Sequence, residues 1–129
     1  MKVLLDTHIF LWALLSPERL DEETIEFLES SDTEKYLSAA SGWEIAEAFE
    51  KGQLRLPERP ENFVRSAIQA SGVLELPITT RDAVQAVTLP PSRSNLFDRL
   101  LIAQAQEHQM YIVTDDPVFA GYDVKIIDC

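Results

Sequence analysis

Four acidic residues are the best candidates for chemistry in this chain. Asp6 follows the apolar run at 3–5, Asp98 stands near the start of an apolar-faced segment, and Asp116 follows the apolar run at 111–114. Glu44 stands among small and apolar helical neighbours, where an unpaired charge is costly. Carboxylate oxygens are the ligands that hard divalent cations prefer, so the four acids together predict a magnesium or manganese site for phosphoryl-transfer chemistry.

Such a site requires elements that bring these acids to one place. Apolar runs predict short strands at 3–5, 35–38, 73–76, 111–114 and 124–127. Periodic patterns, caps and breakers predict helices at 9–15, 21–30, 39–51, 60–71, 79–88 and 96–109. Short apolar strands that alternate with helices indicate an α/β three-layer sandwich, in which helices flank a short parallel sheet. Ligands bind at the carboxyl ends of such strands, so we expect the acids to share that edge.

Helix capping is a competing interpretation for three of the four acids. Asp6 suits the N-cap of the helix after the first strand, and metal binding and capping are about equally favoured there. Asp98 suits a capping box with Asn95. Asp116, followed by Pro117, suits the cap of a short helical turn.

Glu44 and several residues near the acids also have purely structural interpretations. Glu44 could reach water from the edge of its helix, with Trp43 packed in the core. His8 is expected to pack or cap rather than to act as a general base, because a bound metal already activates water. Ser41 is expected to cap its helix or to bond a metal-bound water, and Asp115 to point to solvent.

Length and composition fit one ordinary domain over residues 1–129. The chain is 46% hydrophobic, enough for a core without disulfides, and its one cysteine, Cys129, cannot form a disulfide within the chain. We find no signal-peptide pattern and no run of membrane-spanning length. We therefore expect a soluble, cytoplasmic protein with no membrane association.

The charge balance excludes a simple basic nucleic-acid surface. With 11 Lys and Arg against 22 Asp and Glu, the net charge is -11, so a nucleic-acid substrate would need a metal ion or a basic partner to cancel charge. No glycine-rich loop follows the first strand, which argues against a nucleotide cofactor. Two alternatives stay open: a phosphoryl-handling protein that uses Asp6 or Asp115, and a non-catalytic acidic module that binds a basic partner protein.

The chain resembles the PIN-domain ribonucleases, and more narrowly the VapC-type toxins of bacterial toxin-antitoxin pairs. The resemblance is carried by LLDTH at 4–8, SAASGWEI at 38–45, FDRLLIAQA at 97–105 and VTDD at 113–116. It implies endonucleolytic cleavage of single-stranded RNA with Mg²⁺ or Mn²⁺, a homodimer, and an antitoxin whose tail covers the acidic pocket. The positions matching the family's acids and site hydroxyls are Asp6, Glu44, Asp98, Asp116, Thr7 and Thr114.

One segment departs from the family pattern. Where the family often has His, any residue, Asp and Pro, this chain has Arg93, Ser94, Asn95 and Leu96. Asn95 removes an accessory acidic ligand, so metal affinity or substrate choice is expected to differ. Arg93 adds a cation near the pocket that could contact a phosphate.

Overall fold

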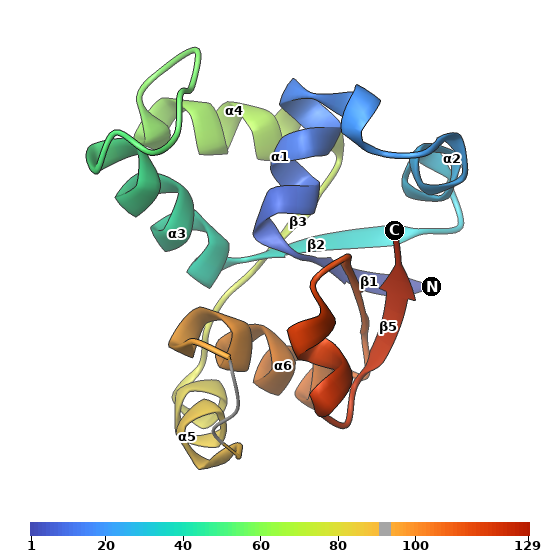
Figure 1. Ribbon diagram of the computed structural model, residues 1–129, viewed down its shortest axis with the longest axis vertical. Coiled ribbons are helices and arrows are strands. Elements are labelled where there is room, and N and C mark those ends of the chain that lie inside the picture. The colour runs from blue at the N-terminus through green and yellow to red at the C-terminus, as the bar shows by residue number, and fades with distance from the viewer. Residues whose placement is uncertain (91–93) are drawn as a thin grey trace.

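The computed structural model describes residues 1–90 and 94–129, and its centre is a five-stranded parallel sheet (Figure 1). The strand order is β3-β2-β1-β4-β5, and all four neighbouring pairs are parallel. The strands are β1 (Lys2–Leu5), β2 (Glu34–Ser38), β3 (Leu74–Leu76), β4 (Tyr111–Thr114) and β5 (Lys125–Asp128). This order puts β1 in the middle of the sheet, between β2 and β4, with helices packed on both faces of the sheet.

Helices connect the strands and cover the sheet. They are α1 (Thr7–Leu15), α2 (Glu22–Glu29), α3 (Ala39–Glu50), α4 (Pro60–Ser71), α5 (Thr80–Thr88) and α6 (Leu96–His108), with 3-10 turns η1 (Pro17–Arg19) and η2 (Pro117–Gly121). Observed and expected bounds differ by at most two residues. The α/β sandwich predicted from the sequence is therefore confirmed.

Local capping explains where several helices begin and end. The Ser38 hydroxyl accepts a hydrogen bond from Ala40 N at 3.0 Å at the start of α3. Thr79 and Asp82 form a reciprocal capping box at the start of α5. Gly72 ends α4 with φ at 70°, a left-handed conformation that glycine adopts without steric cost.

The core lies on both faces of the sheet because successive strand residues point to opposite sides. On one face, Val3 and Leu5 belong to the buried cluster that includes residues of α1, α2 and α4. On the other face, Leu4 belongs to the cluster that includes residues of α5, α6 and η2. Figure 1 shows these helices above and below the strands. Packing on both faces fixes the end of β1 in place.

A buried glutamine ties α6 to the sheet. Gln104 is fully buried, and its Oε1 accepts a hydrogen bond from the Ser38 hydroxyl at 2.5 Å. Its Nε2 donates to the carbonyl oxygens of Leu76, at 3.4 Å, and Pro77, at 3.1 Å. These bonds join α6 to the ends of β2 and β3, so they also set where α6 lies relative to α3.

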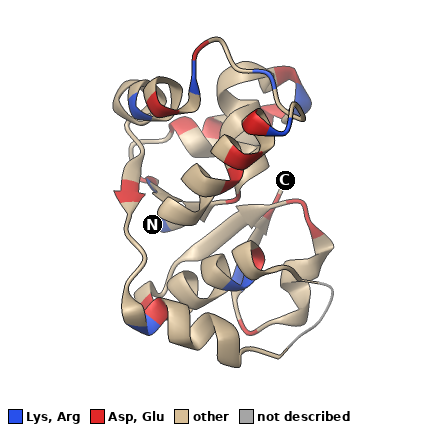
Figure 2. Cartoon of the chain, turned by 90° about the vertical axis from the view of Figure 1, so that its left-hand side faces the viewer, with Lys and Arg blue, Asp and Glu red and all other residues tan. Residues whose placement is uncertain are grey.

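Acidic positions outnumber basic ones on the side of the molecule that Figure 2 presents, in agreement with the net charge of -11. Across residues 1–90 and 94–129, none of the helices combines the length and the apolar character needed to cross a bilayer.

Candidate active site

Asp6 is held at the junction of β1 and α1 with both carboxylate oxygens engaged. It is the N-cap of α1, and its Oδ1 accepts a hydrogen bond from Thr7 N at 2.8 Å. Its Oδ2 accepts a hydrogen bond from the Thr114 hydroxyl at 2.6 Å. Thr114 ends β4, which pairs with β1, so the parallel register brings the two side chains together. Capping is confirmed for Asp6, and the same carboxylate also lines a cavity.

Glu44 extends from α3 toward the start of α1. Its Oε1 lies 2.5 Å from the Thr7 hydroxyl, which also lies 2.8 Å from the hydroxyl of Ser41. Ser41 is fully buried inside α3, so its expected role as a helix cap is wrong. The three side chains join α1 to α3, and they hold the half-buried Glu44 carboxylate at the wall of a cavity.

Asp98 lies in the first turn of α6, in the capping box expected from the sequence. Asp98 N donates to Asn95 Oδ1 at 2.9 Å, and Asn95 N donates to Asp98 Oδ2 at 3.2 Å. The box fixes the side chain at the amino end of α6. Asp98 and Asn95 both line the same cavity as Asp6.

Asp116 begins the turn η2 after β4. Its Oδ1 accepts a hydrogen bond from Val118 N at 3.0 Å, so the expected cap is confirmed. Its backbone N–H donates to the Thr114 hydroxyl at 3.0 Å, and that hydroxyl in turn donates to Asp6. Thr114 therefore orders two of the four acidic residues at once.

His8 connects two carboxylates, an arrangement that the sequence did not predict. Its Nδ1 lies 3.5 Å from Asp6 Oδ2, and its Nε2 forms a short contact with Asp115 Oδ1. The ring also packs edge-on against Trp12, with centroids 4.8 Å apart, as the packing interpretation expected. Asp115 is exposed, but it contacts His8 rather than only solvent.

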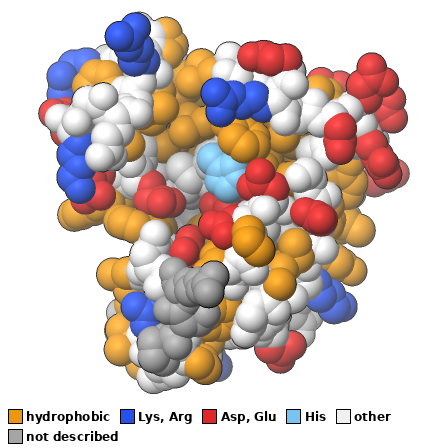
Figure 3. All heavy atoms as spheres, viewed as in Figure 1, with side chains coloured by type: hydrophobic (Ala, Val, Ile, Leu, Met, Phe, Trp, Pro, Cys, Tyr) orange, Lys and Arg blue, Asp and Glu red, His pale blue; other side chains and the backbone are white. Residues whose placement is uncertain are grey.

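The four predicted acids line one cavity of about 430 Å³. They come from the ends of β1 and β4 and from α3 and α6, and Figure 3 shows acidic side chains around a histidine in this hollow. No lysine or arginine is found among the described residues that line the cavity. The lining residues are Asp6, Thr7, His8, Leu11, Glu44, Ile45, Ala48, Gln53, Leu54, Asn95, Asp98 and Asp116.

Burial and mutual repulsion disfavour the charged forms of these acids. Burial is the main cause that raises the pKa of Asp6, Glu44 and Asp98 above their usual values. Neighbouring carboxylates add to the rise, since Asp6 acts on Glu44 and on Asp98, and Asp116 acts on Asp6 and on Asp98. A divalent cation would relieve both effects.

The donor set fits a hard divalent cation, although the ligands are not arranged for one in advance. All four acids offer oxygen, the donor that Mg²⁺ and Mn²⁺ prefer. Within residues 1–90 and 94–129, no three His, Cys, Asp or Glu side chains already have the spacing that would hold a metal ion.

Two sequence expectations near the site have other outcomes. Trp43 is 65% exposed, so the expectation that it packs in the core is wrong; its helix turns Ile45 inward and leaves the indole at the surface. Arg93, the expected phosphate contact, lies outside the described residues.

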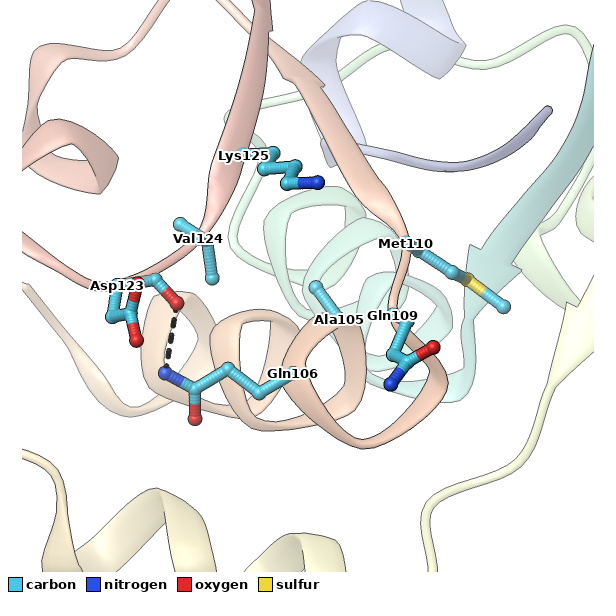
Figure 4. A pocket seen from close by; sticks show the side chains of 7 residues that line it. All are labelled: Ala105, Gln106, Gln109, Met110, Asp123, Val124 and Lys125. Atoms are coloured by element: carbon cyan, nitrogen blue, oxygen red, sulfur yellow. Dashed lines mark hydrogen bonds between the residues drawn. The ribbon is translucent and has the colours of Figure 1, made fainter.

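A larger cavity lies at the opposite edge of the sheet, where β4 and β5 begin (Figure 4). It measures about 520 Å³ and is lined by the end of α6 and the residues that precede these strands. Gln106 Nε2 donates to the carbonyl oxygen of Asp123 at 3.2 Å across it. Its described lining residues include no cluster of acids, so the cavity lined by the four acids is the better candidate for an active site.

The fold and the cavity lined by the four acids define an α/β protein with a carboxylate site at the carboxyl edge of its sheet. A family model described as PIN domain matches residues 3–125, so the chain belongs to the PIN domain family. The chain is also 33% identical over 115 residues to Ribonuclease VapC22 of Mycobacterium tuberculosis, a match that covers 88% of this chain and 86% of that protein. The resemblance seen in the sequence is confirmed.

Solved structures share the fold. VapBC2 from Rickettsia felis, bound to a DNA fragment from its promoter, superposes with a TM-score of 0.68 at 14% identity, over 99% of this chain and 98% of that chain. A toxin-antitoxin complex from Klebsiella pneumoniae gives a TM-score of 0.65 at 19% identity, over 97% of this chain and 95% of that chain. At these identities the likeness concerns the fold alone.

Proposed function

We propose that this chain is a Mg²⁺- or Mn²⁺-dependent endoribonuclease that cleaves single-stranded RNA and acts as the toxin of a toxin-antitoxin pair. One observation carries the proposal: four carboxylates from four parts of the chain line one cavity, with no lysine or arginine among the described residues that line it. The name of the relative VapC22, a ribonuclease, supports the activity.

Asp6, Glu44, Asp98 and Asp116 would hold the cation. A bound divalent ion supplies activation of a water molecule and neutralisation of charge on the phosphodiester. The fit rests on the all-oxygen donor set and on the raised pKa values of Asp6, Glu44 and Asp98, which follow from burial and from the other carboxylates.

The surrounding hydroxyls position these acids. Thr114 holds one oxygen of Asp6 at 2.6 Å, and Thr7 holds one oxygen of Glu44 at 2.5 Å. Ser41 lies 2.8 Å from the same Thr7 hydroxyl, which limits its rotation. Since these hydroxyls are committed to hydrogen bonds, water rather than a side chain is the nucleophile in this proposal.

Asn95 and Arg93 modulate the site in this proposal. The Asn95 side-chain oxygen accepts the hydrogen bond from Asp98 N, so it supports Asp98 instead of adding a charge to the cavity. Arg93 would contact a phosphate of the RNA and offset part of the acidic field.

The partners follow from charge and from the relatives. A net charge of -11 favours a basic antitoxin protein, with a basic tail over the acidic cavity. Solved structures with this fold include toxin-antitoxin complexes. A homodimer is part of the same proposal.

Cleavage of end-labelled single-stranded RNA tests the activity. We expect cleavage with Mg²⁺ or Mn²⁺ and none with excess EDTA, and a loss of at least about 100-fold in Asp6→Asn and Asp98→Asn, because asparagine keeps the cap but not the charge. Glu50→Gln, an exposed change on α3, is the matched control and keeps full activity. Equal cleavage by all variants would refute the proposal, and no cleavage by the folded wild type would favour the non-catalytic acidic module.

A further inference from the structure

The acidic cavity continues into a second cavity of about 410 Å³. The two share Glu44, Ala48, Gln53 and Asn95, so they form one groove between α3 and the start of α6. The additional lining residues of the second cavity are Glu47, Leu96 and Phe97. The groove therefore runs from the four acids to an end that offers an aromatic ring and an exposed aliphatic side chain.

The chemistry of this end suits a flat, uncharged ring with polar edges. Phe97 is partly exposed and Leu96 is 48% exposed. Contact of such apolar side chains with water is unfavourable, so a ligand that covers them gains free energy. Among residues 1–90 and 94–129, no hydrogen bond uses the side-chain amide of Gln53 or the Nδ2 of Asn95. An aromatic face beside two side-chain amides is the combination that binds an unstacked nucleobase.

The described charges at this end disfavour a phosphate there. Glu44 and Glu47 line the cavity, and none of its described lining residues is basic. A nucleobase carries no charge, so it avoids the repulsion that a phosphate would meet. Trp43, which is 65% exposed, donates from Nε1 to Glu47 Oε2 at 3.4 Å, and so places a second aromatic ring beside the rim.

We propose that this end of the groove is a nucleobase subsite that binds the base of a nucleotide adjacent to the phosphate at the four acids. Phe97 stacks on the base, and the amides of Gln53 and Asn95 bond its edge. The subsite gives the chain a sequence preference at one nucleotide of its substrate. This inference rests on the proposed function, because it assumes that single-stranded RNA lies along the groove.

The test compares natural oligoribonucleotides with copies in which each nucleotide in turn is abasic. With wild type and Mn²⁺, we expect one abasic position next to the cleavage site to lower kcat/KM by roughly 5- to 150-fold, the usual effect of one stacked base. Phe97→Ala lowers kcat/KM on the natural substrate by a similar factor and has no further effect on that abasic substrate. Gln53→Ala alters an exposed side chain, for which we expect little effect on stability, and it changes which base is preferred there.

The control is Val84→Ala, which trims an exposed apolar side chain on α5 outside the groove and leaves kcat/KM and the abasic profile unchanged. Wild-type cleavage that is equal at every abasic position overturns the subsite and leaves the nuclease proposal standing. Absence of cleavage on all oligonucleotides overturns both. If Leu96→Ser converts a dimer to a monomer in sedimentation while the abasic profile stays flat, this face binds a second copy and the subsite is rejected.

Discussion

Replacing Thr114 by valine tests whether one hydroxyl orders the acidic site. Thr114 is almost fully buried, and its hydroxyl donates to Asp6 Oδ2 at 2.6 Å and accepts from Asp116 N at 3.0 Å. Valine keeps the shape of the side chain and removes both bonds. A hydrogen bond to a charged group contributes about 1.5–3 kcal/mol and a neutral one about 0.5–1.5 kcal/mol, so we expect a loss of about 2–4 kcal/mol at pH 7.

This loss is measurable by urea and thermal unfolding of the metal-free protein. For a chain of this length it corresponds to a fall in Tm of roughly 7–15 °C, with an unchanged dependence on urea concentration. Thr114→Ser keeps the hydroxyl and is the matched control, with a smaller loss from the missing methyl group.

The effect must also depend on pH with a defined sign. Burial raises the pKa of Asp6 in the folded chain above its unfolded value, so the stability contributed by the protonated acid is lost as pH rises through the folded pKa. The Thr114 hydrogen bond lowers that pKa, so its removal enlarges the loss at neutral pH and matters less near pH 4. A Thr114→Val variant as stable as Thr114→Ser, or a deficit independent of pH, would refute the reasoning.

Three further predictions concern the same framework. Replacing Asp6, Glu44 and Asp98 together by their amides stabilises the metal-free chain relative to wild type, and the difference grows as pH rises from 4 to 8, because burial raises the pKa of each acid. Melting temperatures measured across this pH range test the prediction, and a difference that does not change with pH would contradict it. Gln104→Ala lowers the free energy of unfolding by about 2–4 kcal/mol, because it removes a buried side chain and leaves the Ser38 hydroxyl and the Pro77 carbonyl oxygen without their hydrogen-bond partner. A urea midpoint close to that of wild type would show that these hydrogen bonds contribute little to stability. Trp43→Ala changes the stability by less than about 0.5 kcal/mol, because the indole is mostly exposed, and a larger fall in the urea midpoint would place Trp43 in the core instead.

Local signals in the sequence account for most of the fold. Asp6, Asn95 and Asp116 cap the helical segments for which the sequence suggested them, because capping depends only on neighbouring residues. Parallel strands with short apolar sequences could also be predicted, since a sheet buried on both faces needs continuous apolar runs. The strand order depends on long-range pairing, and the periodicity of single segments does not specify it.

Contacts between distant segments account for what the sequence left open. Helical spacing grouped Trp43 with the apolar face of α3, but the packing of α3 against α1, α4 and α6 buries Ile45 and leaves Trp43 at the surface. The contact of His8 with Asp115 joins residues from α1 and the end of β4, so no local pattern indicated it. That the four acids line one cavity agrees with the predicted site, while their role as metal ligands stays a prediction.

Thermal melting of the metal-free protein with added Mn²⁺, for wild type and Asp98→Asn, tests the cation proposal most directly. An ion that binds only the folded chain stabilises it by about 2.7 kcal/mol at one hundred times its Kd, which raises Tm by roughly 10 °C for this length. We expect that rise in wild type and almost none in Asp98→Asn. Equal melting temperatures with and without Mn²⁺ in wild type, or the same rise in both proteins, would contradict a cation shared by these carboxylates.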